Sequence, residues 1–279
     1  MKTKLKSLAI ELTNNCNFKC SFCWANKSPR PKGFMSKELF DKIITEAQKL
    51  GVTNICLNFA GESTIHPEFE WFCNRVKGIS KSINIITNGS NLIKVGKTLI
   101  DNNINMTISI NGMGNNYEKF CGYPYQNTKN NVSYLLNLRK SKVPTVKIYH
   151  HIWQGETQED IDKYIIEWSN KADGLYFTPS IDNMEWKHGV ESFTFVKQRL
   201  CRFPFYYMAI LWDGSISPCC RDIGAELAFG NVNKNTMAEI FSGDVYNKFR
   251  EMSNAHKFED DMLCSRCKLW EYIPTTIKI

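Results

Sequence analysis

The sequence predicts an α/β fold, a partial (β/α)6 barrel followed by a small C-terminal domain made of a β-hairpin and a helix. Six short β-branched runs alternate with longer amphipathic segments over the first two thirds of the chain, a pattern typical of a parallel sheet with helices outside it. The 279 residues are too few for a closed eight-unit barrel and a second domain. A hairpin signal at Asp213-Gly214 then starts a different pattern.

The predicted strands are short runs rich in Ile, Val, Leu, Thr and Phe. They cover residues 7–12, 54–59, 83–87, 105–110, 145–152 and 174–178. Between them, Ser36 can cap a helix whose apolar residues recur at helical spacing until Gly51 stops it. Thr157-Gln-Glu-Asp160 resembles a capping box before another helix. We therefore expect strand–helix units from the start of the chain to residue 182.

The second domain is expected to follow a linker that lacks a clear period. We place the boundary so that residues 1–182 form the barrel and residues 183–279 form the linker and the small domain. In that domain, residues 208–218 read as two short strands around Asp213-Gly214, and residues 237–252 read as a helix.

Composition narrows the class of protein. The net charge is 35 − 28 = +7, but the basic residues are spread along the chain, so we expect no nucleic-acid partner. No apolar run approaches the roughly 20 residues that cross a bilayer, and no signal peptide is evident. We expect a cytoplasmic protein without a membrane partner. In that reducing compartment, the eleven cysteines favour metal or redox roles over disulfides.

Three cysteines, Cys16, Cys20 and Cys23, lie within eight residues directly after the first predicted strand. Three thiolates on a tight loop can hold three corners of a 4Fe–4S cubane and leave the fourth iron open to a bound molecule. Zinc usually takes four ligands with paired C-x₂-C spacing, and no fourth ligand is evident nearby. The pattern therefore favours an iron–sulfur cluster.

A second set, Cys201, Cys219, Cys264 and Cys267, lies in the last third of the chain. Four cysteines can complete a 4Fe–4S site or a structural zinc site, and their spacing alone does not choose between the two. Cys220 stands beside Cys219 and could replace it as a ligand.

The C-x₃-C-x₂-C pattern, with Phe22 before the third cysteine, resembles the radical S-adenosylmethionine (SAM) superfamily, whose core is a TIM-type barrel. Segment 60–62 looks like the Gly-Gly-Glu segment that meets the SAM amino group, with Ala60 in place of the first glycine. Asn111 stands where the family often has the aspartate of Ser-x-Asp-Gly. By this resemblance, the residues expected to contact SAM are Phe22, Ala60, Gly61, Glu62, Asn88, Ser109 and Asn111.

The late cysteines, with the hairpin between Cys201 and Cys219 and the final Cys264-Ser-Arg-Cys267, resemble the twitch domain, a shortened relative of the SPASM domain. The resemblance implies a second, auxiliary 4Fe–4S cluster in place of zinc. Pro218-Cys219 matches the family pattern and favours Cys219 over Cys220 as a ligand.

The resemblance also implies a reaction. An electron donor such as flavodoxin or ferredoxin reduces the first cluster, SAM bound to its open iron is cleaved, and the 5′-deoxyadenosyl radical takes a hydrogen atom from the substrate. The architecture is similar to that of 2-deoxy-scyllo-inosamine dehydrogenase. We therefore expect an oxidoreductase that removes two electrons from a small sugar- or cyclitol-like substrate, with the auxiliary cluster as electron acceptor.

Two other functions stay open. One is modification of a peptide by epimerisation, crosslinking or residue oxidation. The other is a non-enzymatic zinc-binding module. Four polar residues near predicted strand ends are candidates for substrate binding or hydrogen transfer, namely Cys121, His150, Asp182 and Arg202. Because neighbouring side chains on a strand point to opposite faces, at most one of His150 and His151 faces the barrel interior.

Overall fold

The computed structural model describes residues 3–152, 155–179, 195–197, 201–227, 229–267 and 272–274. Asp182 lies outside the described residues. The chain forms two compact units that are interleaved along the sequence. The first contains Met1–Asn17, Cys23–Ile85 and Arg199–Trp270, and the second contains Phe18–Phe22, Ile86–Gln198 and Glu271–Ile279. These units cut across the proposed boundary at residue 182, which stays a prediction.

The first unit contains parallel strands and the predicted hairpin. Its strands are β1 (Ser7–Ile10), β2 (Asn54–Cys56), the first part of β3 (Ser82–Thr87), β8 (Tyr207–Ile210) and β9 (Ile216–Ser217). The hydrogen-bonded order is β3-β2-β1-β8-β9. Leu8 pairs in parallel with Ile55 on one side and with Met208 on the other. β8 and β9 are antiparallel, so the hairpin predicted around Asp213-Gly214 is confirmed.

The second unit contains three further parallel strands. They are β4 (Asn105–Ser109), β5 (Val146–Ile152) and β6 (Leu175–Pro179). Their order is β6-β5-β4, with Ser109 opposite Tyr149 and Tyr149 opposite Tyr176. This unit also holds a short antiparallel pair, β7 (Phe195–Lys197) and β10 (Tyr272–Pro274). All six predicted strands of the sheet are therefore present, within a few residues of their expected ends.

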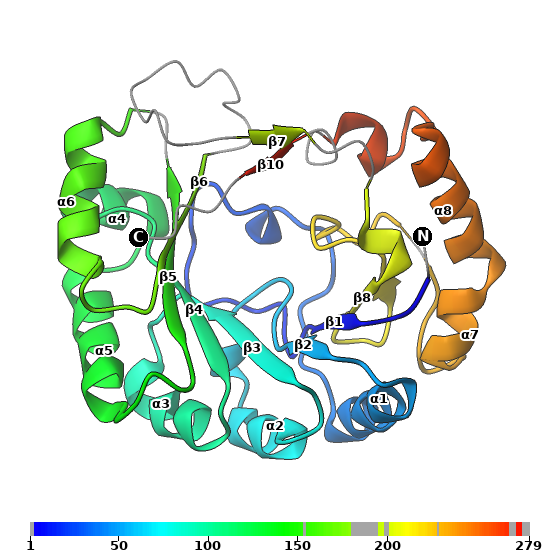
Figure 1. Cartoon of the computed structure of the whole chain (residues 1–279), viewed down its shortest axis with the longest axis horizontal. Coiled ribbons are helices and arrows are strands. Elements are labelled where there is room, and N and C mark those ends of the chain that lie inside the picture. The colour runs from blue at the N-terminus through cyan, green and yellow to red at the C-terminus, as the bar shows by residue number, and fades with distance from the viewer. Residues whose placement is uncertain are drawn as a thin grey trace. The chain divides into compact units, whose positions relative to one another are not determined.

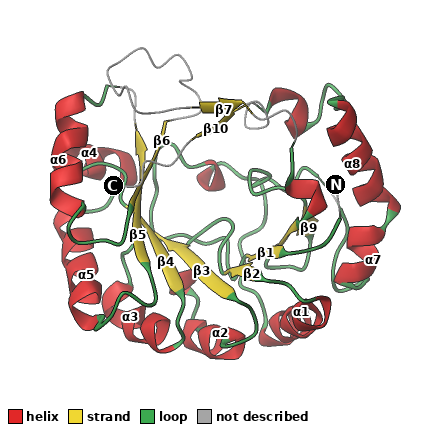
Figure 2. Ribbon diagram, viewed as in Figure 1, coloured by secondary structure: helices red, strands yellow, loops and turns green. Residues whose placement is uncertain are grey.

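Helices follow the parallel strands in the predicted alternation. The first unit has α1 (Lys37–Leu50), α2 (Phe69–Val76), α7 (Met237–Ser242), α8 (Asp244–Ala255) and the 3-10 turns η1 (Trp24–Asn26), η2 (Ser63–Ile65), η4 (Phe203–Phe205) and η5 (Leu263–Arg266). The second has α3 (Leu92–Asp101), α4 (Gly114–Cys121), α5 (Tyr125–Leu138) and α6 (Gln158–Trp168). In Figure 1, α5 and α6 run along one side of β5, and Figure 2 shows the same alternation by element type.

The predicted helix signals are confirmed where they are local. The Ser36 side chain accepts a hydrogen bond from the Leu39 backbone N–H, and Gly51 ends α1 in the left-handed conformation. Thr157 forms both halves of a capping box with Asp160. The single helix expected over residues 237–252 is wrong, because Gly243 adopts an extended backbone conformation there and separates α7 from α8.

The strands bury one face against the helices. Leu8 and Ile10 of β1, Ile108 of β4 and Ile148 of β5 are completely buried. Ala9, on the opposite face of β1, is also buried and packs with Tyr207 and Ala209 of β8 and with aromatic side chains near them. In barrel enzymes, the active site lies at the carboxyl ends of the strands.

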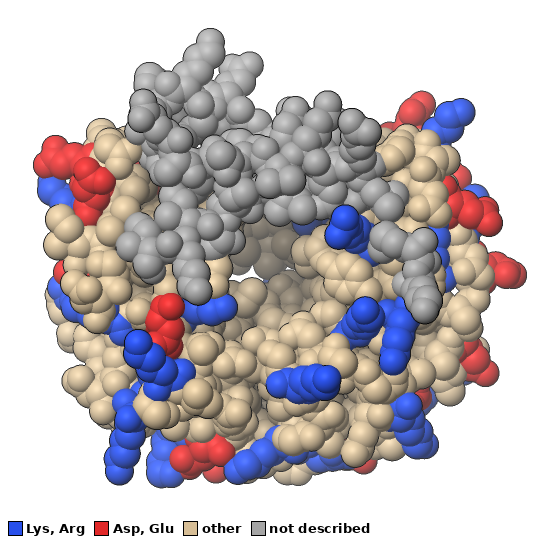
Figure 3. Space-filling view, in the orientation of Figure 1, with Lys and Arg blue, Asp and Glu red and all other residues tan. Residues whose placement is uncertain are grey.

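The surface shows no single block of charge in the view of Figure 3. Lys and Arg side chains stand at separate positions on this face, with acidic side chains between some of them. Among the described residues, no helix combines the length and the hydropathy that a membrane span requires.

Candidate active site

The loop that carries the first three cysteines is closed at its base in the first unit. The Met35 N–H donates to the Leu12 carbonyl at 2.8 Å, and Thr13 Oγ1 donates to the Gly33 carbonyl at 2.5 Å. The Asn14 side chain donates to the Pro31 carbonyl at 2.8 Å and accepts from the Gly33 N–H at 3.0 Å. These bonds fix the two ends of the loop, while Cys16 at its start is exposed.

Gly61 rests directly on this loop. Its φ of +76° is in the left-handed region, and an added Cβ would lie 2.5 Å from the Asn15 carbonyl oxygen. The next N–H, of Glu62, donates to that same oxygen at 2.8 Å. Only glycine allows this approach, so the segment expected to bind the SAM amino group is set against the cysteine loop.

Glu62 is buried, with 2 % of the residue exposed. Its Oε1 accepts hydrogen bonds from the Thr64 N–H at 3.1 Å and the Thr64 hydroxyl at 2.6 Å. A buried carboxylate held in this way is oriented before any ligand arrives, and it can accept a charge-assisted hydrogen bond from an ammonium group.

The middle of the cysteine loop, residues 18–22, belongs to the second unit and is fastened to the end of α4. The Ser21 N–H donates to the Phe120 carbonyl at 2.9 Å, and Cys20 Sγ donates to the Cys121 carbonyl at 3.8 Å. A hydrogen bond with the Cys121 thiol, together with burial, raises the pKa of Cys20. Cys121 is the buried last residue of α4, so the structure places this candidate beside a predicted cluster ligand.

The two histidines of β5 point to opposite faces, as predicted. His150 faces α6, where its fully buried ring stacks on Tyr164 at 4.5 Å and its Nε2 lies 3.0 Å from Glu156 Oε1. The ring of His151 lies edge-on to that of Phe22, with centroids 6.1 Å apart. His151 therefore lies on the side of the cysteine loop. His150, the histidine that we predicted as a candidate, packs against α6 on the other face of β5.

His151 is part of a polar group that sequence reasoning missed. The Tyr149 hydroxyl lies 3.3 Å from both ring nitrogens of His151 and also hydrogen-bonds to the Thr178 hydroxyl of β6. The alternation of side chains along a strand, with a period of two residues, could have indicated this group, because it puts Tyr149 and His151 on one face of β5. Which face that is depends on where α6 packs.

The remaining expected SAM contacts lie at the ends of β3 and β4 in the second unit. Asn88 accepts hydrogen bonds from the backbone and hydroxyl of Ser90, which shapes the turn after β3. Ser109 is the half-buried last residue of β4. The Asn111 carboxamide accepts from the His151 N–H at 2.9 Å, so the residue that replaces the familiar aspartate holds β5 in place.

The late cysteines lie in the first unit, and electrostatic interactions among them raise the pKa of the Cys201 and Cys264 thiols. Burial, with smaller contributions from Cys219 and Cys267, raises the pKa of Cys201 to about 12. Burial, with smaller contributions from Cys219, Cys201 and Cys267, raises the pKa of Cys264 to about 12 as well. These four thiols therefore lie close enough that their thiolate forms would repel one another, an arrangement that a bound cationic centre stabilises.

Cys219 and Cys220 differ in their electrostatic effect on the other late cysteines. Cys219 acts on both Cys201 and Cys264, and its Sγ accepts a hydrogen bond from the Arg221 N–H at 3.4 Å. Cys220 also interacts with Cys201, and both Cys219 and Cys220 raise the pKa of Tyr207, so the difference between them is the effect of Cys219 on Cys264. This difference favours Cys219 as the fourth member of the late set.

Both sets suit iron–sulfur clusters by the chemistry of their donors. Within the described ranges, no group of three or more Cys, His, Asp or Glu side chains is arranged so that it could hold a metal ion. The early set is all thiolate, lies on one loop with a fixed base and leaves one cluster corner without a protein ligand. The late set offers four thiols in one neighbourhood, which matches a cluster with full cysteine ligation.

Arg202, another candidate, is exposed at the start of η4. Its charge lowers the pKa of Tyr206, although burial outweighs this effect and leaves that pKa raised. Arg202 is therefore next to Cys201 in sequence and close to an aromatic side chain, but the described contacts give it no partner in the late cysteine set.

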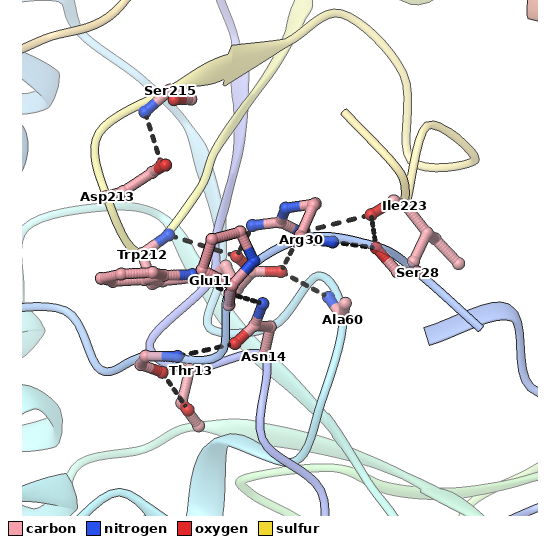
Figure 4. A network of polar contacts seen from close by, with 12 residues as sticks. Glu11, Thr13, Asn14, Ser28, Arg30, Ala60, Trp212, Asp213, Ser215 and Ile223 are labelled. Atoms are coloured by element: carbon pink, nitrogen blue, oxygen red, sulfur yellow. Dashed lines mark hydrogen bonds and ion pairs between the residues drawn. The ribbon is translucent and has the colours of Figure 1, made fainter. Parts of the chain in front are cut away.

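A buried ion pair was also missed by sequence reasoning. Glu11, just after β1, pairs with Arg30 through two hydrogen bonds and also accepts from the backbone of Ala60 and Trp212 (Figure 4). Nothing in the sequence signals that residues so far apart meet, because each looks like an ordinary surface charge.

Comparison with known proteins agrees with this geometry. Residues 10–166 match the family model of the radical SAM superfamily, and residues 201–268 match the SPASM iron–sulfur cluster-binding domain. The chain is 22% identical, over 98% of its length and 90% of the relative, to the tungsten-containing aldehyde ferredoxin oxidoreductase cofactor-modifying protein of Pyrococcus furiosus.

Two solved structures share the fold. Streptococcus suis SuiB bound to its precursor peptide SuiA has a TM-score of 0.68 at 16% identity, covering 89% of this chain and 67% of SuiB. BtrN in complex with AdoMet and 2-DOIA has a TM-score of 0.59 at 16% identity, covering 91% and 88% of the two chains. The predicted partial barrel and its C-terminal iron–sulfur region are confirmed, and SAM and 4Fe–4S clusters are the cofactors. The chain therefore belongs to the radical SAM superfamily.

Proposed function

We propose that this radical SAM enzyme removes two electrons from a small sugar- or cyclitol-like substrate and uses a twitch-type auxiliary cluster as electron acceptor. The observation that carries the proposal is the neighbourhood of four buried or half-buried thiols, Cys201, Cys219, Cys264 and Cys267, whose charges act on one another. Four cysteines leave no corner of a cubane free for substrate. Electron transfer is then the simplest role for that centre.

We assign SAM binding to the first-unit segment 60–62 and to side chains at the ends of β3 and β4. The Glu62 carboxylate, held by Thr64, accepts hydrogen bonds from the SAM amino group. We assign Ser109 to the ribose or the methionine carboxylate, and Asn88 and Phe22 to further contacts with SAM. When bound, SAM and the clusters supply hydrogen-atom abstraction and an acceptor for one electron.

The substrate side of the proposal rests on Tyr149, His151 and Thr178. Their hydroxyls and imidazole form a connected donor and acceptor group, which suits a polyhydroxylated ligand. Oxidation of a carbinol removes one hydrogen atom from carbon, one proton from oxygen and one further electron, and a carbon–oxygen double bond forms. His151 is the group we assign to accept the proton, because imidazole titrates near neutral pH.

The electron donor is expected to be acidic. Besides the buried Arg30, residues 12–37 contain four lysines and no Asp or Glu. Trp24, directly after Cys23, is 61% exposed, with the Lys27 ammonium 5.4 Å from its ring centroid. A cationic surface with an exposed aromatic ring next to the cysteine loop suits an acidic one-electron protein such as flavodoxin or ferredoxin.

The test is an anaerobic assay with reductant, SAM and candidate polyols deuterated at single carbons. The proposal predicts deuterium in 5′-deoxyadenosine from one carbon only, together with a ketone product formed in equal amount. Label transfer that yields only an epimerised alcohol contradicts the oxidation. Absence of 5′-deoxyadenosine from anaerobic protein with both clusters contradicts the radical chemistry itself.

Peptide modification is the second candidate, and one observation favours it. The TM-score with SuiB, solved with its precursor peptide, is 0.68 against 0.59 for BtrN. It predicts a peptide product that has lost two hydrogen masses through crosslinking or residue oxidation, or that carries one solvent deuterium after epimerisation. Mass spectrometry of peptides incubated in deuterated water separates these outcomes. Membership of the superfamily argues against the remaining alternative, a zinc-binding module without activity.

A further inference from the structure

The Glu11 carboxylate and the Arg30 guanidinium form a bidentate ion pair inside the first unit. Arg30 Nη1 lies 3.0 Å from Glu11 Oε1, and Nη2 lies 2.5 Å from Oε2. The exposed fractions of the two side chains are 0% for Glu11 and 8% for Arg30. A planar guanidinium that meets a carboxylate through two parallel bonds fixes both the distance and the orientation of the two segments.

The pair also holds backbone groups from other segments. Glu11 Oε1 accepts from the Ala60 N–H at 3.3 Å, and Oε2 accepts from the Trp212 N–H at 3.2 Å. Arg30 Nη1 donates to the Ile223 carbonyl at 3.3 Å. Figure 4 shows these groups converging on Glu11 and Arg30. The two carboxylate oxygens then accept four hydrogen bonds, which is about their full capacity.

Each segment that Glu11 and Arg30 contact is close in sequence to residues predicted to bind a cluster or SAM. Glu11 lies five residues before Cys16, and Arg30 lies seven residues after Cys23. Ala60 starts the segment we assign to SAM. Trp212 is in the turn between β8 and β9, and Ile223 follows Cys219 by four residues. The pair therefore joins the cysteine loop, the SAM segment and the auxiliary-cluster segment.

Stability alone does not explain an ion pair at this place. Replacement of a buried ion pair by apolar side chains of similar volume is often neutral or stabilising. An apolar pair here would leave the Ala60 and Trp212 N–H groups and the Ile223 carbonyl without these partners. The charged pair is thus suited to positioning three backbone segments at once.

We propose that Glu11 and Arg30 are positioning residues of the radical SAM reaction. They hold the SAM segment and the Cys219 segment in register with the first cysteine loop, without touching SAM or substrate. This inference rests on the SAM-binding role proposed for segment 60–62. It predicts that loss of the pair weakens SAM binding while both clusters remain assembled.

The test compares Glu11→Gln, Arg30→Gln and the double variant with wild type. A matched control is Arg75→Gln, which removes a more exposed ion pair, with Asp41, in the same unit. Iron per chain, thermal unfolding, and the KM for SAM and kcat of reductive SAM cleavage are measured anaerobically. Because outer-shell partners typically change affinity 10–100-fold, the single variants should raise KM roughly tenfold or more, with kcat less affected and roughly eight iron atoms retained.

The double variant separates positioning from stability. It removes both buried charges, so its unfolding temperature should recover relative to the single variants, while its KM stays high because the four-bond acceptor is gone. Arg30→Lys, the mildest change, keeps the charge but loses the bidentate geometry, and should give an intermediate KM.

Wild-type KM values in the single variants would overturn the inference, as would a KM in the double variant that recovers together with its stability. If the Gln variants fail to fold, a wild-type KM in Arg30→Lys has the same meaning. Failure of the proposed function looks different, since wild type would then cleave SAM without oxidising substrate, or would cleave no SAM at all.

Discussion

The Glu62 N–H donates to the Asn15 carbonyl at 2.8 Å, and this contact exists because Gly61, one residue earlier, has no side chain. A Cβ at Gly61 would meet the Asn15 oxygen at 2.5 Å and the Thr13 oxygen at 2.6 Å. The proposed SAM segment and the cysteine loop are therefore in direct backbone contact.

Gly61→Ala should weaken SAM binding. The substitution places a methyl group against backbone atoms and also carries the cost of about 1–2 kcal/mol for a left-handed L-residue. We expect KM for SAM to rise roughly tenfold in 5′-deoxyadenosine formation. Gly51→Ala is the control, since Gly51 has a similar φ of +65° but open space around its Cβ position. Equal KM values in the two variants would refute the contact as a determinant of SAM binding.

Substitutions of His151 and His150 should have different effects, the first on substrate oxidation and the second on stability. His151→Gln removes the proposed proton acceptor, so substrate oxidation should fall by about 10²-fold or more, whereas SAM cleavage without substrate should persist. His150→Gln disrupts the stack on Tyr164 and the contact with Glu156, and should lower the unfolding temperature. Turnover normalised to folded protein, with thermal unfolding of each variant, checks this. Normal oxidation by His151→Gln would remove that residue from the mechanism.

The first cluster is tested by removal of its ligands. The triple variant Cys16→Ala, Cys20→Ala and Cys23→Ala should keep about half of the roughly eight iron atoms per chain and lose all SAM cleavage. Iron analysis of anaerobically purified protein and assay of 5′-deoxyadenosine measure both quantities. Unchanged SAM cleavage in the triple variant would end the radical interpretation.

The fourth auxiliary ligand is tested by a pair of adjacent substitutions. Because Cys219 raises the pKa of both Cys201 and Cys264, Cys219→Ala should lose about half of the iron and Cys220→Ala none. The absorbance of the remaining cluster and its SAM cleavage serve as internal controls. The reverse pattern would assign Cys220 as the ligand.

Features that depend on residues close together in the chain could be predicted without the structure. The three early thiols lie on one loop. The C-x₃-C-x₂-C spacing therefore predicts that they bind one cluster together, whatever the position of the loop in the fold. Ser36 and Thr157 cap helices through partners three residues away, and the alternation of strands and helices follows from local periodicity. These predictions needed no knowledge of packing.

The residues that orient the proposed cofactor site could be identified only from long-range packing. The period of two on β5 cannot tell which histidine faces the cysteine loop until α6 packs against His150. Glu11 and Arg30 are 19 residues apart, and only the return of the chain around the cysteine loop brings their charges together. Contacts of this kind depend on the burial of groups that local sequence cannot position, and for that reason the cluster ligands could be predicted from sequence but the residues that orient them could not.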